Sequence, residues 1–118
     1  MKKPDDITRL QNIFDSALKA VQFAQGRSRG ELDINEMLAL AIMRLLEIIG
    51  EASREVSDKL RANYPEVPWQ KMASMRNRLI HAYFEVNQDL VWETVTTDLP
   101  PLITQLQEVL AKEGKQSK

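Results

Sequence analysis

The chain has 118 residues, of which 43% are hydrophobic and 28% charged, so it is long enough for one domain with one core and is not disordered throughout. Its net charge of −1 excludes binding of nucleic acid through an overall positive field and leaves only a local basic patch. The chain has no cysteine and a single histidine, which excludes disulfides and thiolate chemistry and disfavours a transition-metal site. We expect no cofactor, and we expect a reducing cytoplasm as the location.

The N-terminal stretch MKKPDDITRL has no apolar run behind its lysines, so we expect no signal peptide. Apolar residues then recur at steps of three and four from about Asp6 to Gln25, which is the spacing of one helical face. Gly26 follows as the expected C-terminal cap, and the polar stretch RSRGE predicts a connection.

A second helix is predicted from Asp33 to about Asn63, with Asp33 and Glu36 at the spacing of a capping box. Between Met37 and Ile49 only two residues are charged, so apolar side chains cover most of the circumference. Such a helix is buried on more than one side. We therefore expect a second subunit to cover it, although a central helix inside one monomer would explain the same pattern. The stretch is too short to span a bilayer, which needs about 20 residues.

Prolines mark the expected helix boundaries in the second half of the chain. Pro65 ends the long helix, and Pro68 suits the first turn of a third helix that we predict from Pro68 to Phe84. Asn87 is the expected cap of a fourth helix over residues 88–97. The sequence Asp98-Leu99-Pro100-Pro101 must kink or restart that helix.

The last helix is predicted over residues 102–112, followed by a flexible polar tail over 112–118. No segment shows sustained alternation of apolar and polar residues, so we expect no sheet. The predicted fold is one all-α domain covering residues 1–118, an antiparallel up-down bundle of four or five helices that forms a homodimer.

The third predicted helix contains the residues that could take part in a reaction. At about 100° per residue, Arg76 and Tyr83 share a largely apolar face, whereas Asn77 and His81 share the opposite one. A guanidinium among apolar side chains is costly unless a carboxylate satisfies it. Glu51 on the second helix is the expected partner. A purely structural Arg–Glu bridge, with the Tyr83 hydroxyl bonded to backbone, would also fit this pattern.

These residue types suit cleavage of RNA without a metal, in which a 2′-oxygen attacks the adjacent phosphate. His81 titrates near neutrality and can act as general base or acid, and Arg76 can neutralise charge on the phosphate. Such a reaction needs both a base and an acid, but each chain has one histidine. Two copies of this helix across a dimer axis would supply both groups.

Other side chains have plainer interpretations. Trp69, Trp92 and Phe84 could stack on bases, but their places at helix starts and on apolar faces favour core packing. Lys71 and Arg78 near the motif are candidates for RNA binding, together with loop residues Arg27 and Arg29, although each alone also fits a solvated surface.

Five short segments, in this order, resemble the HepT-like branch of the HEPN superfamily. They span about half of the chain and are specific as a set: Ile49-Gly50-Glu51-Ala52, Pro65-Glu66-Val67-Pro68-Trp69, Met75-Arg76-Asn77 through His81-Ala82-Tyr83-Phe84, Val91-Trp92, and Asp98-Leu99-Pro100-Pro101-Leu102. One departure is Ser74, which stands where relatives often have glycine.

The resemblance implies a dimeric helical bundle with an R-x4-H-x-Y motif beside a cleft at the interface. It implies a metal-independent endoribonuclease toxin that cleaves RNA, such as mRNA or tRNA, and a minimal nucleotidyltransferase antitoxin as partner. By position, Arg76 and His81 would be catalytic, Asn77 the polar neighbour, and Tyr83 the residue to which the antitoxin transfers AMP. A bulky anion on Tyr83 would fill the cleft and repel RNA.

Two other functions remain open from the sequence. The chain could be a non-catalytic helical adaptor that binds a nucleotidyltransferase and presents a substrate or nucleotide. It could also be a purely structural dimeric bundle in which Arg76 is merely buried and paired.

Overall fold

The computed structural model describes residues 5–81 and 85–116. Its elements are α1 (Asp6–Ala24), α2 (Glu31–Ile34), α3 (Glu36–Glu55), α4 (Asp58–Asn63), α5 (Trp69–Ala73), α6 (Met75–Leu79), β1 (Ile80–His81), β2 (Glu85–Val86), α7 (Gln88–Glu93), the π-helix η1 (Thr94–Asp98) and α8 (Leu99–Gln116). The predicted all-α fold is confirmed.

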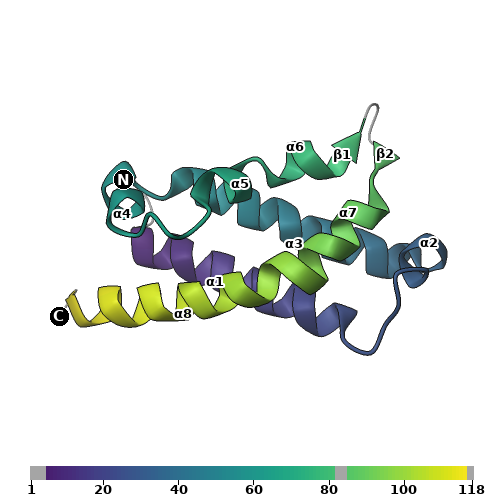
Figure 1. Cartoon of the computed structure of the whole chain (residues 1–118), viewed down its shortest axis with the longest axis horizontal. Helices are drawn as coiled ribbons and strands as arrows, with labels where there is room; N and C mark the ends of the chain where they lie inside the picture. The colour runs from purple at the N-terminus through teal and green to yellow at the C-terminus, as the bar shows by residue number, and fades with distance from the viewer. Residues whose placement is uncertain (1–4, 82–84, 117–118) are drawn as a thin grey trace.

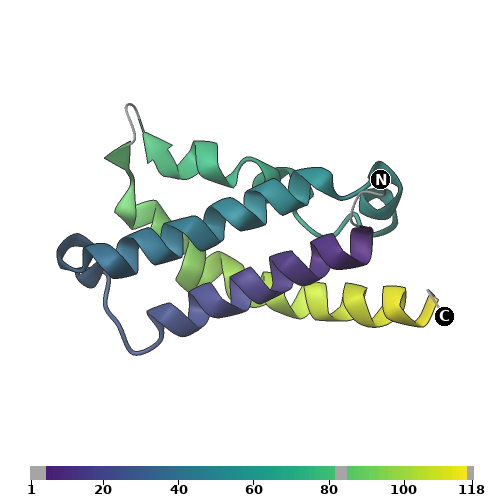
Figure 2. The same ribbon diagram turned by 180° about the vertical axis from the view of Figure 1, so that it is seen from behind.

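The long elements form an antiparallel up-down bundle. As Figure 1 shows, α8 ends at the end of the molecule where α1 begins, so these two helices run antiparallel, and α3 runs back along α1. The chain returns through α5 and α6 on the far side of α3 from α1, and then reverses into α7 and α8. The view from behind in Figure 2 places α2 and the β1–β2 hairpin together at the end opposite α4. In the part of the chain that the structure describes, no helix is long and apolar enough to cross a membrane.

The core lies where α1, α3 and α8 meet. It contains large side chains with no exposed surface, among them Leu10, Ile42, Leu46, Ile49 and Leu106. The segment α5–α6, called the motif layer below, contributes Met72, Met75 and Leu79 to the same cluster. At about 25 cal/mol per Å² of buried apolar surface, this core supplies the main stabilisation of the bundle.

Local signals account for several helix ends. Gly26 follows α1 with φ 74°, the left-handed conformation that favours glycine, as predicted. Asn87 accepts a hydrogen bond from the Leu90 amide and caps α7, as predicted. The π-helix η1 ends at Asp98, two residues before Pro100 and Pro101, which lack the amide protons that would continue an ordinary helix.

The second predicted helix is divided into three. Asn35, rather than Asp33, caps α3 by accepting from the Leu38 amide at 3.0 Å. Ser57 restarts the chain as α4 and is held by Asp6, whose carboxylate accepts from the Ser57 hydroxyl at 2.6 Å. The capping box at Asp33 was wrong because Asp33 lies inside α2 and an equally good cap lies two residues further on.

Two further corrections concern the second half. The helix predicted to reach Phe84 ends at Leu79, and β1 pairs with β2 in antiparallel register, Ile80 opposite Val86. The prediction of no sheet was therefore wrong at this hairpin. Residues 112–116, predicted to be tail, belong to α8, and Glu113 accepts a hydrogen bond from the Tyr64 hydroxyl at 2.6 Å.

Candidate active site

Arg76 lies in the first turn of α6 and faces α3. Its Nε donates to Glu47 Oε2 at 3.0 Å, and 48% of the arginine side chain and 24% of the glutamate side chain remain exposed. Arg76 is therefore a paired but accessible cation, and the expectation of a guanidinium buried in an apolar stripe was wrong.

The predicted partner of Arg76 was also wrong. Glu51 pairs instead with Arg44, at 3.5 Å between Oε1 and Nη1, and both side chains are mostly exposed. Glu47 lies one helical turn before Glu51. Arg76 on α6 therefore contacts α3 one turn closer to the start of α3 than we expected. Glu51 still borders the hollow beside Arg76.

Gly50 sets the distance between α3 and the motif layer. A Cβ at this position would lie 3.3 Å from the Met72 carbonyl oxygen, which is tighter than ordinary packing. Arg54, one turn further along α3, donates from Nε to the Ala73 carbonyl at 3.0 Å. The backbone just before α6 is thus held against α3 at two points, and this contact positions Arg76.

Two hollows adjoin this contact. One, of about 360 Å³, is lined by Glu47, Gly50, Glu51, Arg54 and Arg76. The other, of about 340 Å³, is lined by Arg54, Arg61, Gln70, Ala73, Ser74 and Asn77. Arg54 lines both. The structure therefore places Arg76 and Asn77 at neighbouring hollows on either side of Arg54.

The histidine and tyrosine of the motif are described only in part. The backbone of His81 lies in β1, opposite Glu85, and its side chain is outside what the structure describes. Tyr83 lies outside the described residues, as does Phe84. Because α6 ends at Leu79 and His81 lies in β1, the helical face predicted to be shared by Asn77 and His81 does not exist. The face predicted for Arg76 and Tyr83 involves a residue outside the described ones.

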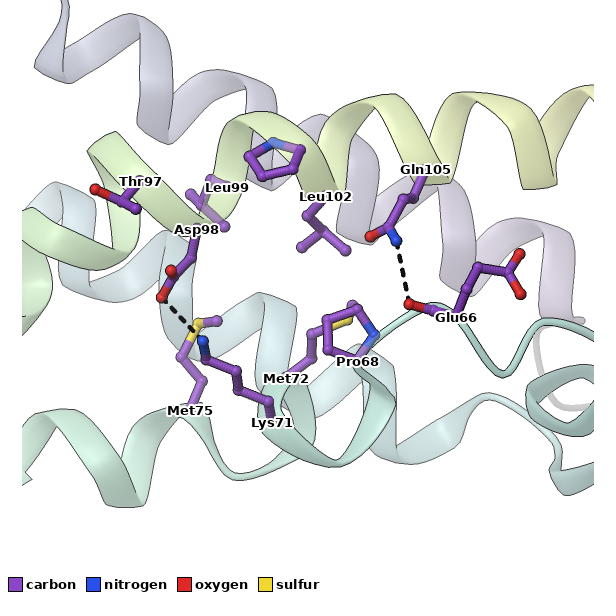
Figure 3. A pocket seen from close by; sticks show the side chains of 11 residues that line it. Glu66, Pro68, Lys71, Met72, Met75, Thr97, Asp98, Leu99, Leu102 and Gln105 are labelled. Atoms are coloured by element: carbon purple, nitrogen blue, oxygen red, sulfur yellow. Dashed lines mark hydrogen bonds and ion pairs between the residues drawn. The ribbon is translucent and has the colours of Figure 1, made fainter.

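Lys71 is not brought together with Arg76. Its Nζ lies 3.3 Å from Asp98 Oδ2, and both residues line a separate hollow of about 280 Å³ between α5 and the η1–α8 segment (Figure 3). That hollow has an apolar wall containing Met72, Met75 and Leu102, and the Gln105 amide donates to the Glu66 carbonyl across its rim. The Lys71 ammonium is thus neutralised on another face.

The other predicted basic residues and aromatics are also placed. Arg78 is exposed on α6. Arg27 pairs with Glu31, and Arg29 pairs with Asp33 and Asp89, so neither is a free cation. Trp69 is buried and donates from Nε1 to the Tyr64 carbonyl at 2.9 Å, which confirms core packing, and Trp92 is half-buried against the core.

Sequence reasoning missed three residues of this site, namely Glu47, Arg54 and Arg61. Glu47 had a usable signal, because it is one of only two charged residues in the apolar run from Met37 to Ile49. A charge in such a run is retained when a specific partner satisfies it. Nothing in the local sequence marks Arg54 or Arg61, which become neighbours only when α4 folds back on the end of α3.

The comparisons with known proteins identify the family. The model of the family "Ribonuclease HepT-like" matches residues 13–109. The chain belongs to this family.

Several relatives carry names that agree with this assignment. A protein of Methanocaldococcus jannaschii named "Putative RNase" is 39% identical over 102 residues, covering 86% of this chain and 94% of the relative. A "Putative RNase" of Caldanaerobacter subterraneus is 36% identical, with 88% and 93% covered. A "Probable ribonuclease HepT" of Thermococcus cleftensis is 50% identical over 62 residues, 52% of this chain and 56% of the relative. The search of solved structures gave no significant match.

Proposed function

We propose that this HepT-like chain is a metal-independent endoribonuclease in which Arg76 binds the scissile phosphate and His81 transfers protons. The observation that carries the proposal is the accessible Arg76 guanidinium, held at 3.0 Å by Glu47 beside a hollow and five residues before the only histidine. A guanidinium fixed in this way is preorganised to meet charge that develops on a phosphate.

The proposed reaction is an internal transesterification. A base removes the proton of a ribose 2′-hydroxyl, the 2′-oxygen forms a bond to phosphorus, and the bond from phosphorus to the 5′-oxygen of the next nucleotide breaks. An acid protonates that 5′-oxygen, which leaves a 2′,3′-cyclic phosphate and a 5′-hydroxyl. Each chain holds one imidazole, so two copies of His81 would provide the base and the acid.

An exposed apolar patch supports a homodimer. Ile34 and Met37 are 84% exposed and Leu40 is 63% exposed, at the junction of α2 and α3. At about 100° per residue, Met37 and Leu40 lie on the same third of the α3 circumference as Glu47. A second copy that covers the patch would therefore approach Arg76.

Replacing both Met37 and Leu40 by Glu should give a monomer by sedimentation and abolish cleavage, whereas Phe23→Glu on α1 should do neither.

The direct test of catalysis is cleavage of RNA by purified protein in EDTA. Wild type should cut, and a folded His81→Ala variant should lose at least about 100-fold in rate, because general acid–base catalysis contributes about 10² to 10⁴. Lys59→Ala, an exposed change on α4, is the matched control. A folded His81→Ala variant with full activity would refute the assignment, and a wild type that never cuts would favour the adaptor function.

We also propose that the protein is a cytoplasmic toxin silenced by a minimal nucleotidyltransferase that transfers AMP to Tyr83. A phosphate group on this residue would add negative charge to the motif and repel the phosphates of RNA. Induced expression should slow growth. The partner enzyme with ATP should add the mass of AMP to wild type and not to Tyr83→Phe, and an equal mass gain in both would exclude Tyr83 as the modified residue.

A further inference from the structure

The arginines of the chain divide into two groups. Each of five lies within 4.0 Å of a carboxylate oxygen: Arg9, Arg27, Arg29, Arg44 and Arg76. Within residues 5–81 and 85–116, no carboxylate pairs with the other three, Arg54, Arg61 and Arg78. Two of these three, Arg54 and Arg61, line one hollow together.

Backbone carbonyls hold both of these guanidinium groups. Arg61 donates from Nη2 to the carbonyls of Ser53 and Arg54, at 2.9 and 2.8 Å, at the end of α3. Arg54 donates from Nε to the Ala73 carbonyl at 3.0 Å. A guanidinium has five N–H donors, so each group keeps donors for a ligand after making these bonds. The bonds limit side-chain motion without neutralising the positive charge.

The lining of the hollow suits an anion. Besides the two arginines it contains the polar residues Gln70, Ser74 and Asn77, with Ala73 as the one apolar member, and no carboxylate. The hollows around Lys71 and Arg44 differ, because each includes acidic side chains. Arg54 also borders the hollow of Arg76, so cationic groups continue from Arg76 through Arg54 to Arg61.

We propose that Arg54 and Arg61 bind a phosphate of the RNA strand next to the phosphate held by Arg76. This inference rests on the proposed ribonuclease function and adds a second phosphate subsite to it. Guanidinium groups bind phosphate oxygens through paired, charge-assisted hydrogen bonds, and the amide of Asn77 offers a further donor. The subsite also supplies the local basic patch that a chain with net charge −1 needs in order to bind RNA.

The test measures binding of 2′-O-methyl RNA, which lacks the attacking hydroxyl and so reports affinity without cleavage. Affinity is followed from 50 to 200 mM salt. For the Arg54→Gln/Arg61→Gln double variant, we expect weaker binding and a slope of log K against log salt that is shallower by about 0.7, since the two arginines neutralise one phosphate and each neutralised phosphate of a single strand contributes about 0.7. Lys19→Gln/Lys59→Gln, with the same charge change at exposed positions of α1 and α4, should keep the wild-type slope.

A second variant keeps the backbone contacts of both arginines intact. Gln70→Glu adds a negative charge to the hollow and should weaken binding at least several-fold, whereas Gln107→Glu on the exposed side of α8 should not. Folding of every variant is checked by thermal unfolding.

The outcomes separate this subsite from the proposed function. If wild type cuts and binds RNA while the slope of the double variant and the affinity of Gln70→Glu stay at wild type, the subsite is wrong and the ribonuclease function stands. If wild type neither cuts nor binds RNA, both are wrong. If the double variant binds RNA like wild type but no longer binds the partner nucleotidyltransferase, the hollow is a protein-docking surface and the subsite is wrong.

Discussion

Helix α3 makes different kinds of contact on its two sides. Ile42, Leu46 and Ile49 are fully buried in the core that α1 and α8 complete, and their contacts are non-directional. Toward α5 and α6, the contacts of α3 include a close backbone approach at Gly50 and polar bonds from Glu47 and Arg54. Hydrophobic burial stabilises the first contact, whereas the second places individual polar groups, as a catalytic site requires.

The largest expected effect is on the polar side. Arg76→Gln should lower the rate of RNA cleavage by at least about 100-fold, because removing one fixed donor to a developing oxyanion costs about 10² to 10³. It should cost less than about 1 kcal/mol of unfolding free energy, since the ion pair with Glu47 is partly exposed. Lys19→Gln, the same loss of charge at an exposed position of α1, is the control and should keep both activity and stability. Equal losses of rate in the two variants would contradict the assignment.

A change at Gly50 should disturb the spacing between the two layers. Gly50→Val would place side-chain atoms against the Met72 carbonyl and should lower the unfolding free energy by about 1–3 kcal/mol, together with the cleavage rate. Gly114→Val on α8, where nothing lies within 4 Å of a new Cβ, should change stability by about 0.5 kcal/mol or less. Urea unfolding of both variants measures the difference, and equal losses would show that Gly50 is not a spacer.

The smallest expected effect concerns a polar contact on the bundle side. The hydrogen bond to Glu113 raises the pKa of Tyr64 from 10.0 to about 12. The raised pKa means that the folded state favours the protonated phenol, so the stabilisation is complete below pH 10 and is lost as pH rises toward 12. Tyr64→Phe should therefore cost about 1 kcal/mol at pH 7, and its gap to wild type should narrow by pH 11. Urea unfolding at the two pH values checks this, and a constant gap would contradict it.

Much of the fold could be predicted because its signals are local. The periodic apolar residues of α1, the cap at Asn87 and the left-handed Gly26 each follow from a few neighbouring residues. The hairpin could not be predicted in this way. A helix pattern continues past Leu79, and the structure instead ends α6 there and pairs Ile80 with Val86, six residues further along the chain.

By itself, the sequence determined that this protein is an all-helical member of the HepT-like family with Arg76, Asn77 and His81 in one short segment, because helical period, caps and motif spacing are properties of neighbouring residues. Only the tertiary structure decided that Glu47 rather than Glu51 pairs with Arg76, and that Arg54 and Arg61 share a hollow with Asn77. The partner of a charge depends on where two helices cross, which is a property of the packed chain and not of neighbouring residues, and Gly50 lies close to the Met72 backbone at that crossing.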